Sequence, residues 1–116
     1  KANSDFDVEL ERGLNNDGYL AILADTLSKL ARDIKPDIVI YDAGVDIHID
    51  DRLGYLEITD HGLRARDDMV LGHFLSRNIP VATVIGGGYD KDVAALMGRH
   101  AHIFKASADA YERYCR

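Results

Sequence analysis

The sequence predicts an α/β protein whose strands run parallel. Two short runs, IVIY at residues 38–41 and VATVIG at residues 81–86, are rich in β-branched side chains and resemble strands that are buried on both faces of a parallel sheet. Apolar residues at helical spacing occur before, between and after these runs. A strand, a helix and a second strand in this order indicate a right-handed parallel crossover, so α/β is the expected class.

The amino-terminal third is expected to form an extended segment and then a helix. In DFDVEL at residues 5–10, apolar and acidic side chains alternate, which is the period of a half-buried extended segment. A polar turn with capping asparagine and aspartate residues follows, and residues 19–34 then repeat apolar side chains at spacings of three and four. We therefore expect one buried helical stripe, formed by Leu20, Leu23, Leu27, Leu30 and Ile34.

Further helices are expected on either side of the second strand. Residues 59–78 read as a helix with Thr59 or Asp60 as its cap and Asn78 near its end. Its inward residues should be Leu63, Val70, Leu71, Phe74 and Leu75. After the second strand, residues 86–100 begin another helix, and residues 106–116 are expected to form a last one. The 116 residues contain no internal repeat and suit one domain, 1–116, without an internal boundary.

Composition excludes several classes of function. Fourteen basic and twenty acidic residues give a net charge of −6, and no dense basic cluster is present, so nucleic acid is not expected as a direct partner. The single cysteine, Cys115, precludes an internal disulfide and is read as a bystander thiol in a reducing compartment. No stretch approaches the roughly 20 apolar residues of a membrane span, so we expect a cytoplasmic protein without membrane contact. The chain also starts without methionine, which suggests an upstream part.

The connection after the first strand carries several potential metal ligands. YDAGVDIHIDDRLG, at residues 41–54, contains four aspartates and one histidine. Residues 44–59 form a sixteen-residue connection, and loops longer than about 12–15 residues in compact domains are usually functional or disordered. Asp46, His48, Asp50 and Asp51 could donate to Zn²⁺, Mg²⁺ or Ca²⁺, although the spacing fits no calcium loop. Composition alone favours a solvated acidic loop over a metal site.

A glycine run follows the second strand. Gly86, Gly87, Gly88 and Tyr89 come directly after it, so both connections leave the carboxyl ends of parallel strands, where open α/β sheets bind ligands. Three glycines permit close backbone approaches, but neither nucleotide-binding fingerprint is present. The phenol of Tyr89 could donate to an oxyanion, and the pattern equally allows an aromatic lid over the strand end.

These segments together resemble a known family. YDAGVDIHIDDRLG, the helix opening TDHGLRARD, and IPVATVIGGGYDKD are similar, in this order and spacing, to the C-terminal part of zinc-dependent histone deacetylases and acetylpolyamine amidohydrolases. The bacterial and class IV branches are the most similar, and the resemblance runs over essentially the whole chain. It implies an arginase/deacetylase-type three-layer fold with a parallel sheet.

The resemblance also implies roles for particular residues. The aspartate before Arg-Leu-Gly is a zinc ligand in that family, which corresponds to Asp51, and the tyrosine after the glycines is the oxyanion donor, which corresponds to Tyr89. Ile58, Gly87 and Gly88 correspond to the substrate tunnel. The implied reaction is Zn²⁺-assisted hydrolysis of an acetylated protein lysine or a small acetylated amine, with histidine as general base.

The departures from the family lead to a second expectation. The paired catalytic histidines and the Asp-x-His zinc ligands have no counterpart in the chain. We therefore expect the C-terminal part of a longer domain, inactive alone, which pairs with its missing N-terminal part or forms a homo-oligomer. The alternative is a non-catalytic α/β module that binds a ligand or a protein partner.

The remaining polar residues of these segments are read as structural or solvent-facing. Asp50 stands where many relatives have glycine and is expected to face solvent, while His48 is read as a rim or surface residue. His100 and His102 are two residues apart, but a lone His-x-His is a weak metal signal, so structural roles are preferred.

Overall fold

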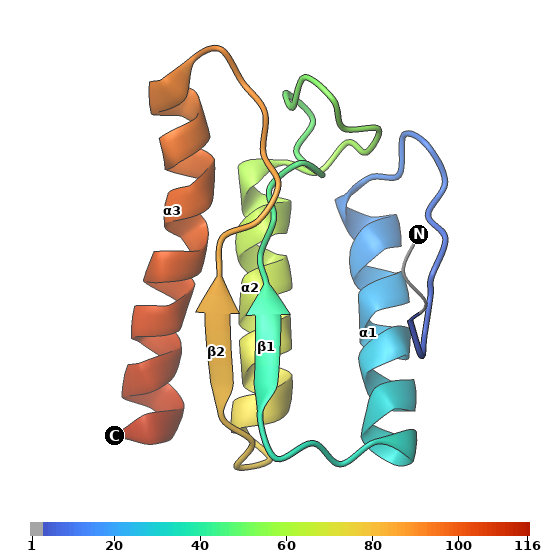
Figure 1. The fold of residues 1–116 in the computed structure, drawn as a ribbon, viewed down its shortest axis with the longest axis vertical. Helices are drawn as coiled ribbons and strands as arrows, with labels where there is room; N and C mark the ends of the chain where they lie inside the picture. The colour runs from blue at the N-terminus through green and yellow to red at the C-terminus, as the bar shows by residue number, and fades with distance from the viewer. Residues whose placement is uncertain (1–3) are drawn as a thin grey trace.

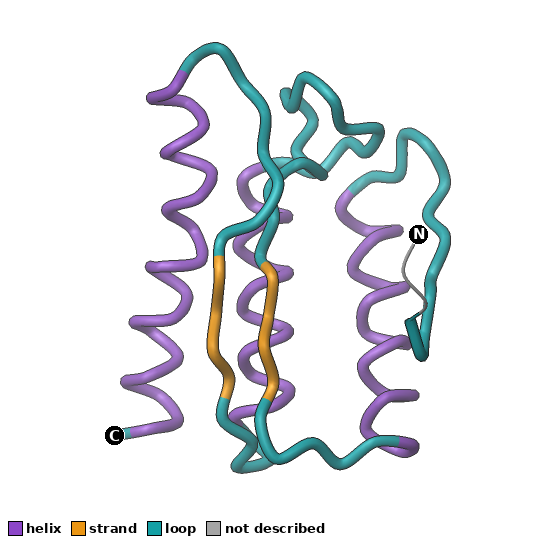
Figure 2. The backbone as a smooth tube through the Cα atoms, viewed as in Figure 1, coloured by secondary structure: helices purple, strands orange, loops and turns teal. Residues whose placement is uncertain are grey.

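The computed structural model describes residues 4–116 and shows helices packed on one face of a parallel sheet (Figures 1 and 2). In chain order the elements are α1 (Asn16–Asp33), β1 (Val39–Asp42), α2 (Asp60–Leu75), β2 (Val81–Val84), α3 (Val93–Ala110) and a π-helical turn, η1 (Tyr111–Cys115). The two strands pair in parallel with Val39 opposite Val81. The predicted α/β class and the predicted parallel pairing are confirmed.

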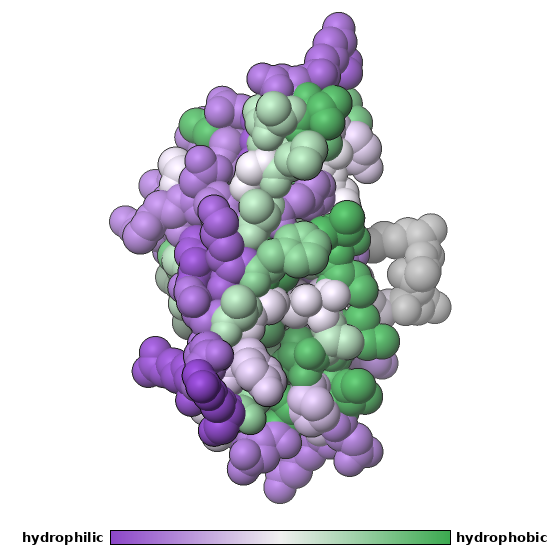
Figure 3. Space-filling view, turned by 90° about the vertical axis from the view of Figure 1, so that its left-hand side faces the viewer, coloured by the Kyte–Doolittle hydropathy of each residue, from purple (hydrophilic) through white to green (hydrophobic). Residues whose placement is uncertain are grey.

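The sheet is covered on one face only. Val39 and Tyr41 of β1 point toward the helices and contact the apolar cores, whereas Ile40 between them is 74% exposed. Strands of this composition are typical of sheets buried on both faces, but the second face is open here, because no helix within residues 4–116 covers it. Figure 3 shows apolar surface gathered on that side of the molecule. The exposed large apolar residues in the two strands and directly beside their ends are Ile38, Ile40, Val84 and Ile85.

α2 is the central helix, and the sequence predicts it closely. The Thr59 side chain accepts a hydrogen bond from the Gly62 N–H at 3.3 Å, which satisfies a free donor in the first turn. Asn78 adopts a positive φ of 59° just past the helix, a conformation that asparagine tolerates. The predicted inward residues Leu63, Val70, Leu71 and Phe74 are buried, and Leu75 is half-buried. α2 thus packs against both α1 and α3.

α1 is less buried than its stripe predicts. The Asn15 side chain caps it by accepting from the Gly18 N–H at 3.0 Å. Leu27 is buried against Val70 and Phe74, but Ile34 is 46% exposed, and the other three predicted stripe residues are half-buried. The apolar stripe of α1 is wider than the surface of α2 on which it packs.

Two local predictions are wrong. The expected half-burial of residues 5–10 is wrong: Phe6, Val8 and Leu10 are exposed, because the segment runs beside α1 and pairs with no strand of the described chain (Figure 1). Residues 93–110 form one continuous helix that passes into η1, where two helices were expected. Ala106 and Ala110 let α3 pack closely on α2 in the second half of this helix, and no proline interrupts residues 93–110.

Within residues 4–116, no helix combines the length and the apolar character that crossing a membrane requires.

Candidate functional site

Two loops meet at the carboxyl ends of the strands. We call residues 43–59 the acidic loop and residues 85–92 the glycine loop; both lie at the top of Figure 1. The Val45 N–H donates to the Gly87 carbonyl at 2.6 Å, and the Arg52 N–H donates to the Tyr89 carbonyl at 3.0 Å. The predicted convergence of the two loops is therefore present.

Asp51 lies at the junction of the loops. One carboxylate oxygen, Oδ1, accepts from the Tyr89 N–H at 2.7 Å, and Oδ2 accepts from the N–H groups of Leu53 and Gly54 at 3.0 and 2.8 Å. Its own N–H donates to the His48 carbonyl at 3.0 Å, which closes a tight turn. The residue is 8% exposed, so the carboxylate is oriented by backbone donors before any ligand binds.

The Asp51 carboxylate fits a bound cation. Within residues 4–116, no lysine, arginine or histidine forms an ion pair with it. Buried carboxylates in proteins are generally paired with a cation or coordinate a metal, and Oδ1 of Asp51, which accepts a single backbone hydrogen bond, retains acceptor capacity. Carboxylate oxygen is an ordinary ligand for Zn²⁺.

Close approaches of the chain, within the acidic loop and between the two loops, require glycine at Gly54 and Gly87. A Cβ on Gly54 would lie 2.0 Å from the Asp46 carbonyl oxygen, and a Cβ on Gly87 would lie 2.3 Å from the Asp46 carboxylate. The first contact is with backbone, which cannot move aside as a flexible side chain can. Asp46 is therefore enclosed between Gly54 and Gly87 rather than turned outward as a free ligand.

Tyr89 has a fixed backbone and an available side chain. Asp51 holds its N–H and Arg52 holds its carbonyl, as described above. The residue is 46% exposed, and its hydroxyl forms no hydrogen bond with any residue of the described chain. A phenol in this state can donate to a ligand that lies beside Asp51.

A buried polar network supports the acidic loop from below. Arg66 of α2, 4% exposed, donates to the Gly44 carbonyl at 2.6 Å and to Asp67 at 3.0 Å. The Tyr41 hydroxyl donates to the same Asp67 oxygen at 2.5 Å. Burial raises the pKa of the Tyr41 phenol, which keeps it protonated as a donor. The network fixes the point where the acidic loop leaves β1.

This network was missed in the sequence, although its spacing contains a signal. Arg66 and Asp67 lie within the predicted helix at positions that its apolar residues surround, since Leu63 precedes Arg66 by three residues and Val70 follows it by four. A charged residue at such a position is either a surface residue with a bent side chain or a buried ion pair. The buried arrangement forms here because the Gly44 carbonyl of the acidic loop accepts a hydrogen bond from Arg66.

His48 is buried, contrary to its interpretation as a rim or surface residue. It is 5% exposed; Nδ1 accepts from the Asp50 N–H at 3.1 Å, and Nε2 lies 3.1 Å from the Asp60 carboxylate. Because Nδ1 accepts a hydrogen bond, Nε2 carries the proton and donates to Asp60. The loop folds back over the ring through a bridge between His48 and Ile58. Asp50, in contrast, is exposed as predicted.

The other histidines also have structural surroundings. His102 of α3 lies 3.4 Å from the same Asp60 oxygen that bonds to His48, so this carboxylate joins the acidic loop to α3. The ring of His100 lies behind the glycine loop, where its Nε2 would be 3.0 Å from a Cβ at Gly88.

The four potential metal ligands of the acidic loop do not form a common site. In the part of the chain that the structure describes, no group of three histidine, cysteine, aspartate or glutamate side chains is arranged to hold a metal ion. Asp51 is the single candidate ligand with suitable burial and orientation. Ile58 has no exposed surface and packs on Val45 and Leu63, and its role in a substrate tunnel stays a prediction.

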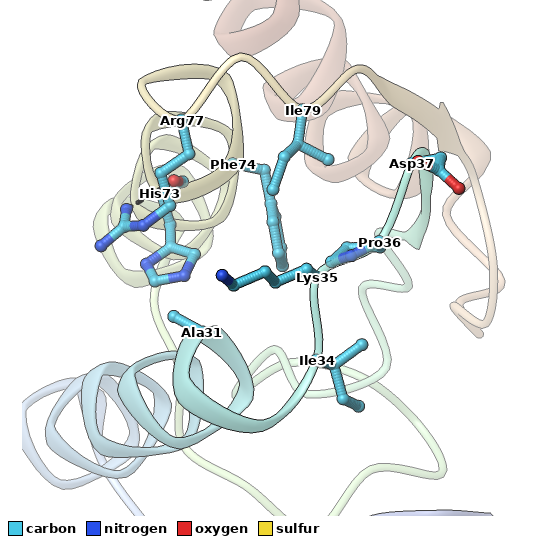
Figure 4. A pocket seen from close by; sticks show the side chains of 9 residues that line it. All are labelled: Ala31, Ile34, Lys35, Pro36, Asp37, His73, Phe74, Arg77 and Ile79. Carbon is cyan, nitrogen blue, oxygen red and sulfur yellow. Dashed lines mark hydrogen bonds between the residues drawn. The ribbon is translucent and has the colours of Figure 1, made fainter.

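A separate pocket lies at the opposite end of the sheet (Figure 4). It has a volume of about 380 Å³, with Phe74, Ile79 and Pro36 as apolar walls and Lys35, His73 and Arg77 among its polar lining. These residues precede the strands or end α2, so the pocket lies away from both loops. The carboxyl ends of helices carry partial negative charge, which the cationic side chains of Lys35 and Arg77 balance.

Comparisons with known proteins show the family of the chain. The family model for the histone deacetylase domain matches residues 1–104. The chain belongs to the histone deacetylase family. It is 50% identical over 111 residues to an uncharacterized protein of Picosynechococcus sp., covering 96% of this chain and 37% of that protein. It is 38% identical over 90 residues to histone deacetylase 2 of Arabidopsis thaliana, covering 78% and 23%.

The deacetylase fold is also found in a solved structure. The chain superposes on acetylpolyamine aminohydrolase from Burkholderia pseudomallei with a TM-score of 0.70 and 21% identity, over 86% of this chain and 27% of that one. This similarity confirms the predicted fold class. The chain spans 37% and 23% of the lengths of the two family relatives that it matches.

Proposed function

We propose that the chain is the C-terminal part of a zinc-dependent deacetylase domain that hydrolyses acetyl-lysine-type amides. The observation that carries the proposal is the junction of the two loops. There, a buried carboxylate without a cationic partner in the described chain is hydrogen-bonded to the backbone of a tyrosine whose hydroxyl is free. A ligand for a metal and a donor for an oxyanion thus lie in adjacent positions.

Asp51 and Tyr89 would share the work of the site. Asp51 would provide one oxygen ligand to Zn²⁺, with the remaining ligands and the general-base histidine coming from outside these 116 residues. A bound Zn²⁺ supplies Lewis-acid polarisation of the amide carbonyl. The Tyr89 hydroxyl would donate to the oxygen of that carbonyl as negative charge develops on it. The hydrogen bonds of the Tyr89 N–H and carbonyl fix the backbone from which this donor extends.

We propose two substrate classes, an acetylated protein lysine and a small acetylated amine. The names of the similar proteins include a histone deacetylase and an acetylpolyamine aminohydrolase, which act on these two kinds of amide. Within this chain, Gly87 and Gly88 form the part of the proposed tunnel nearest to Tyr89. They leave the backbone accessible to an extended acyl group without distinguishing the two classes.

We further propose that residues 1–116 form one unit of a single longer domain. The open face of the sheet, with Ile40 at 74% exposure, is the surface on which the rest of the domain would pack. The chain alone should be inactive because the catalytic histidines of the family have no counterpart in it.

The test is the zinc content and the acetyl-lysine hydrolysis of the longer protein, with Asp51→Ala and Asp50→Ala as a matched pair. Asp51→Ala should lose both zinc and activity. Asp50→Ala changes an exposed neighbour of the same charge and should lose neither. A folded, metal-free and inactive wild-type protein would contradict the proposal and favour a non-catalytic binding module.

A further inference from the structure

We propose that Arg99 of α3 is a positioning residue for Tyr89 and that it acts through the carboxylate of Asp90. This inference rests on the proposed role of Tyr89 as the oxyanion donor. It assigns a function to the ion pair between the buried Arg99 and the half-buried Asp90, which lies outside the junction of the two loops.

Arg99 and Asp90 join the glycine loop to the third helix. The Arg99 Nη2 donates to the Asp90 Oδ2 at 2.8 Å, and the Asp92 N–H donates to the other Asp90 oxygen at 2.8 Å. Asp92 in turn caps α3 by accepting from the Ala95 N–H at 3.1 Å. The carboxylate that follows Tyr89 is therefore held at both oxygens by a single rigid helix.

These contacts complete the restraint on the Tyr89 backbone. Asp51 holds the N–H of Tyr89, the Arg52 N–H holds its carbonyl, and Arg99 holds the next residue along the chain. The Tyr89 hydroxyl has no hydrogen-bond partner in the described chain that would orient it, so the placement of the ring depends on the backbone that carries it. Without Arg99, the carboxyl-terminal side of Tyr89 keeps the contact with Arg52 and the local Asp92 N–H bond to Asp90, but it loses the contact with the body of α3.

The stability of the fold does not by itself account for Arg99. The residue is 6% exposed, and its Nη1 has no hydrogen-bond partner in the described chain. Burying a guanidinium carries a desolvation cost that a single ion pair roughly offsets, so such a pair contributes little net stability. The Asp92 N–H and Arg99 both hold the pKa of Asp90 below its ordinary value, so the pair stays charged near neutral pH.

The first part of the test uses the longer zinc-loaded enzyme. Arg99→Met should lower kcat by about 10²-fold, because a displacement of roughly 1 Å at a reacting group has an effect of this order, while KM changes little. Arg99→Lys keeps the charge and should recover part of the loss. Arg64→Met is the matched control, since Arg64 joins α2 to α3 through Asp109 at the surface, and it should leave kcat unchanged.

A double-mutant cycle separates positioning from a general structural effect. In a Tyr89→Phe background, Arg99→Met should lower kcat by less than about threefold, because the hydroxyl that it positions is already absent. The same loss in both backgrounds would overturn the inference. If Arg99→Met does not fold, Asp90→Asn replaces it in the cycle, with the same two outcomes.

A readout without turnover completes the experiment. Amide hydrogen exchange at Tyr89 should be faster in Arg99→Met than in the wild-type protein, and unchanged in Arg64→Met. Normal activity of Tyr89→Phe would overturn both this inference and the proposed role of Tyr89. An impaired Tyr89→Phe together with a normal Arg99→Met would overturn this inference alone.

Discussion

The carboxylate of Asp51 accepts a 2.7 Å hydrogen bond from the backbone N–H of Tyr89, although 38 residues separate them in the sequence. The proposed metal ligand and the residue of the proposed oxyanion donor are thus joined by a direct hydrogen bond, so a shift of one should shift the other. A change at Asp51 should alter the placement of Tyr89 as well as the metal, and the two effects can be measured separately.

Asp51→Asn should destabilise the metal-free protein as well as weaken metal binding. Asparagine offers one acceptor oxygen where aspartate offers two, so its NH₂ group would face a backbone N–H from Tyr89, Leu53 or Gly54. A buried donor left without an acceptor costs about 1–3 kcal/mol in the free energy of unfolding. Urea unfolding in the presence of a chelator measures this loss. Asp50→Asn, on the exposed side, should change the free energy by no more than about 0.5 kcal/mol.

Tyr89→Phe should impair turnover without impairing folding. The substitution keeps the backbone N–H that bonds to Asp51 and removes a hydroxyl that has no partner in the described chain. Loss of one oxyanion donor typically lowers kcat by roughly 10²–10³-fold. Steady-state kinetics of the longer enzyme test this, with thermal unfolding as the check on folding. Tyr55→Phe, at an exposed tyrosine that stacks on Arg12, is the control, and equal activity of the two variants would contradict the role of Tyr89.

The regular elements were predictable from local pattern. β1 and β2 follow from β-branched runs, and α2 follows from Thr59 as cap and from apolar spacing, because these signals require only neighbouring residues. The open sheet face was not predictable in this way. A run such as IVIY has the composition of a strand covered on both sides, and the chain supplies helices for only one of them. The exposure of Ile40 is therefore a property of what surrounds the strand.

The site was predictable where a motif marks it and not where the fold makes it. Asp51 and Tyr89 were found by resemblance, because Asp51 directly precedes the Arg-Leu-Gly motif and Tyr89 directly follows the glycine run. His48 was misread as a surface residue, since its burial depends on the pairing of the acidic loop with itself at Ile58. Arg66 and Arg99 were missed because their partners lie on other segments, 22 and 9 residues away.

Gly54→Ala and Gly98→Ala should have opposite effects on stability. A Cβ at Gly54 would lie 2.0 Å from the Asp46 carbonyl oxygen, so the turn that orients Asp51 must shift, and stability and zinc affinity should both fall. Gly98 lies on α3 with no atom within 4 Å of its Cβ position. Alanine there should raise the free energy of unfolding by about 0.5–1 kcal/mol, the helix-propensity difference. Thermal unfolding and zinc titration of both variants measure the contrast.

Ile40→Lys should act in opposite directions in the short chain and in the longer protein. In the 116-residue chain Ile40 is 74% exposed, so lysine should reduce self-association through the open sheet face. If the longer protein covers this face, the same lysine becomes a buried charge there and should cost about 3–5 kcal/mol. Sedimentation of the short chain and urea unfolding of the longer protein test the two halves. A short wild-type chain that is a monodisperse, cooperatively melting monomer would contradict the proposal.

His73 should make the protein less stable at acid pH. Burial lowers the pKa of its imidazole below the ordinary value of 6.5, and the guanidinium of Arg77 lowers it further. Its Nε2 is buried without a partner in the described chain, so a proton added there finds no acceptor. Figure 4 shows the ring between Arg77 and Lys35. The neutral form is therefore the one that the folded protein accommodates.

The sign of the effect follows from this depressed pKa. Below about pH 6.5 the unfolded chain binds a proton at His73 that the folded protein does not, so the stability present above that pH is lost as the pH falls through the folded pKa. The melting temperature of the wild-type protein should thus drop more than that of His73→Gln on going from about pH 7.5 to about pH 5.5, a range that brackets the ordinary histidine pKa.

Two further variants serve as controls. Arg77→Gln removes the second cause of the depressed His73 pKa and should give an intermediate drop in melting temperature. His61→Gln, at an exposed histidine near the start of the same helix, is the matched control and should show the wild-type drop. Equal pH dependence in wild type and His73→Gln would show that protonation of this buried ring does not limit stability.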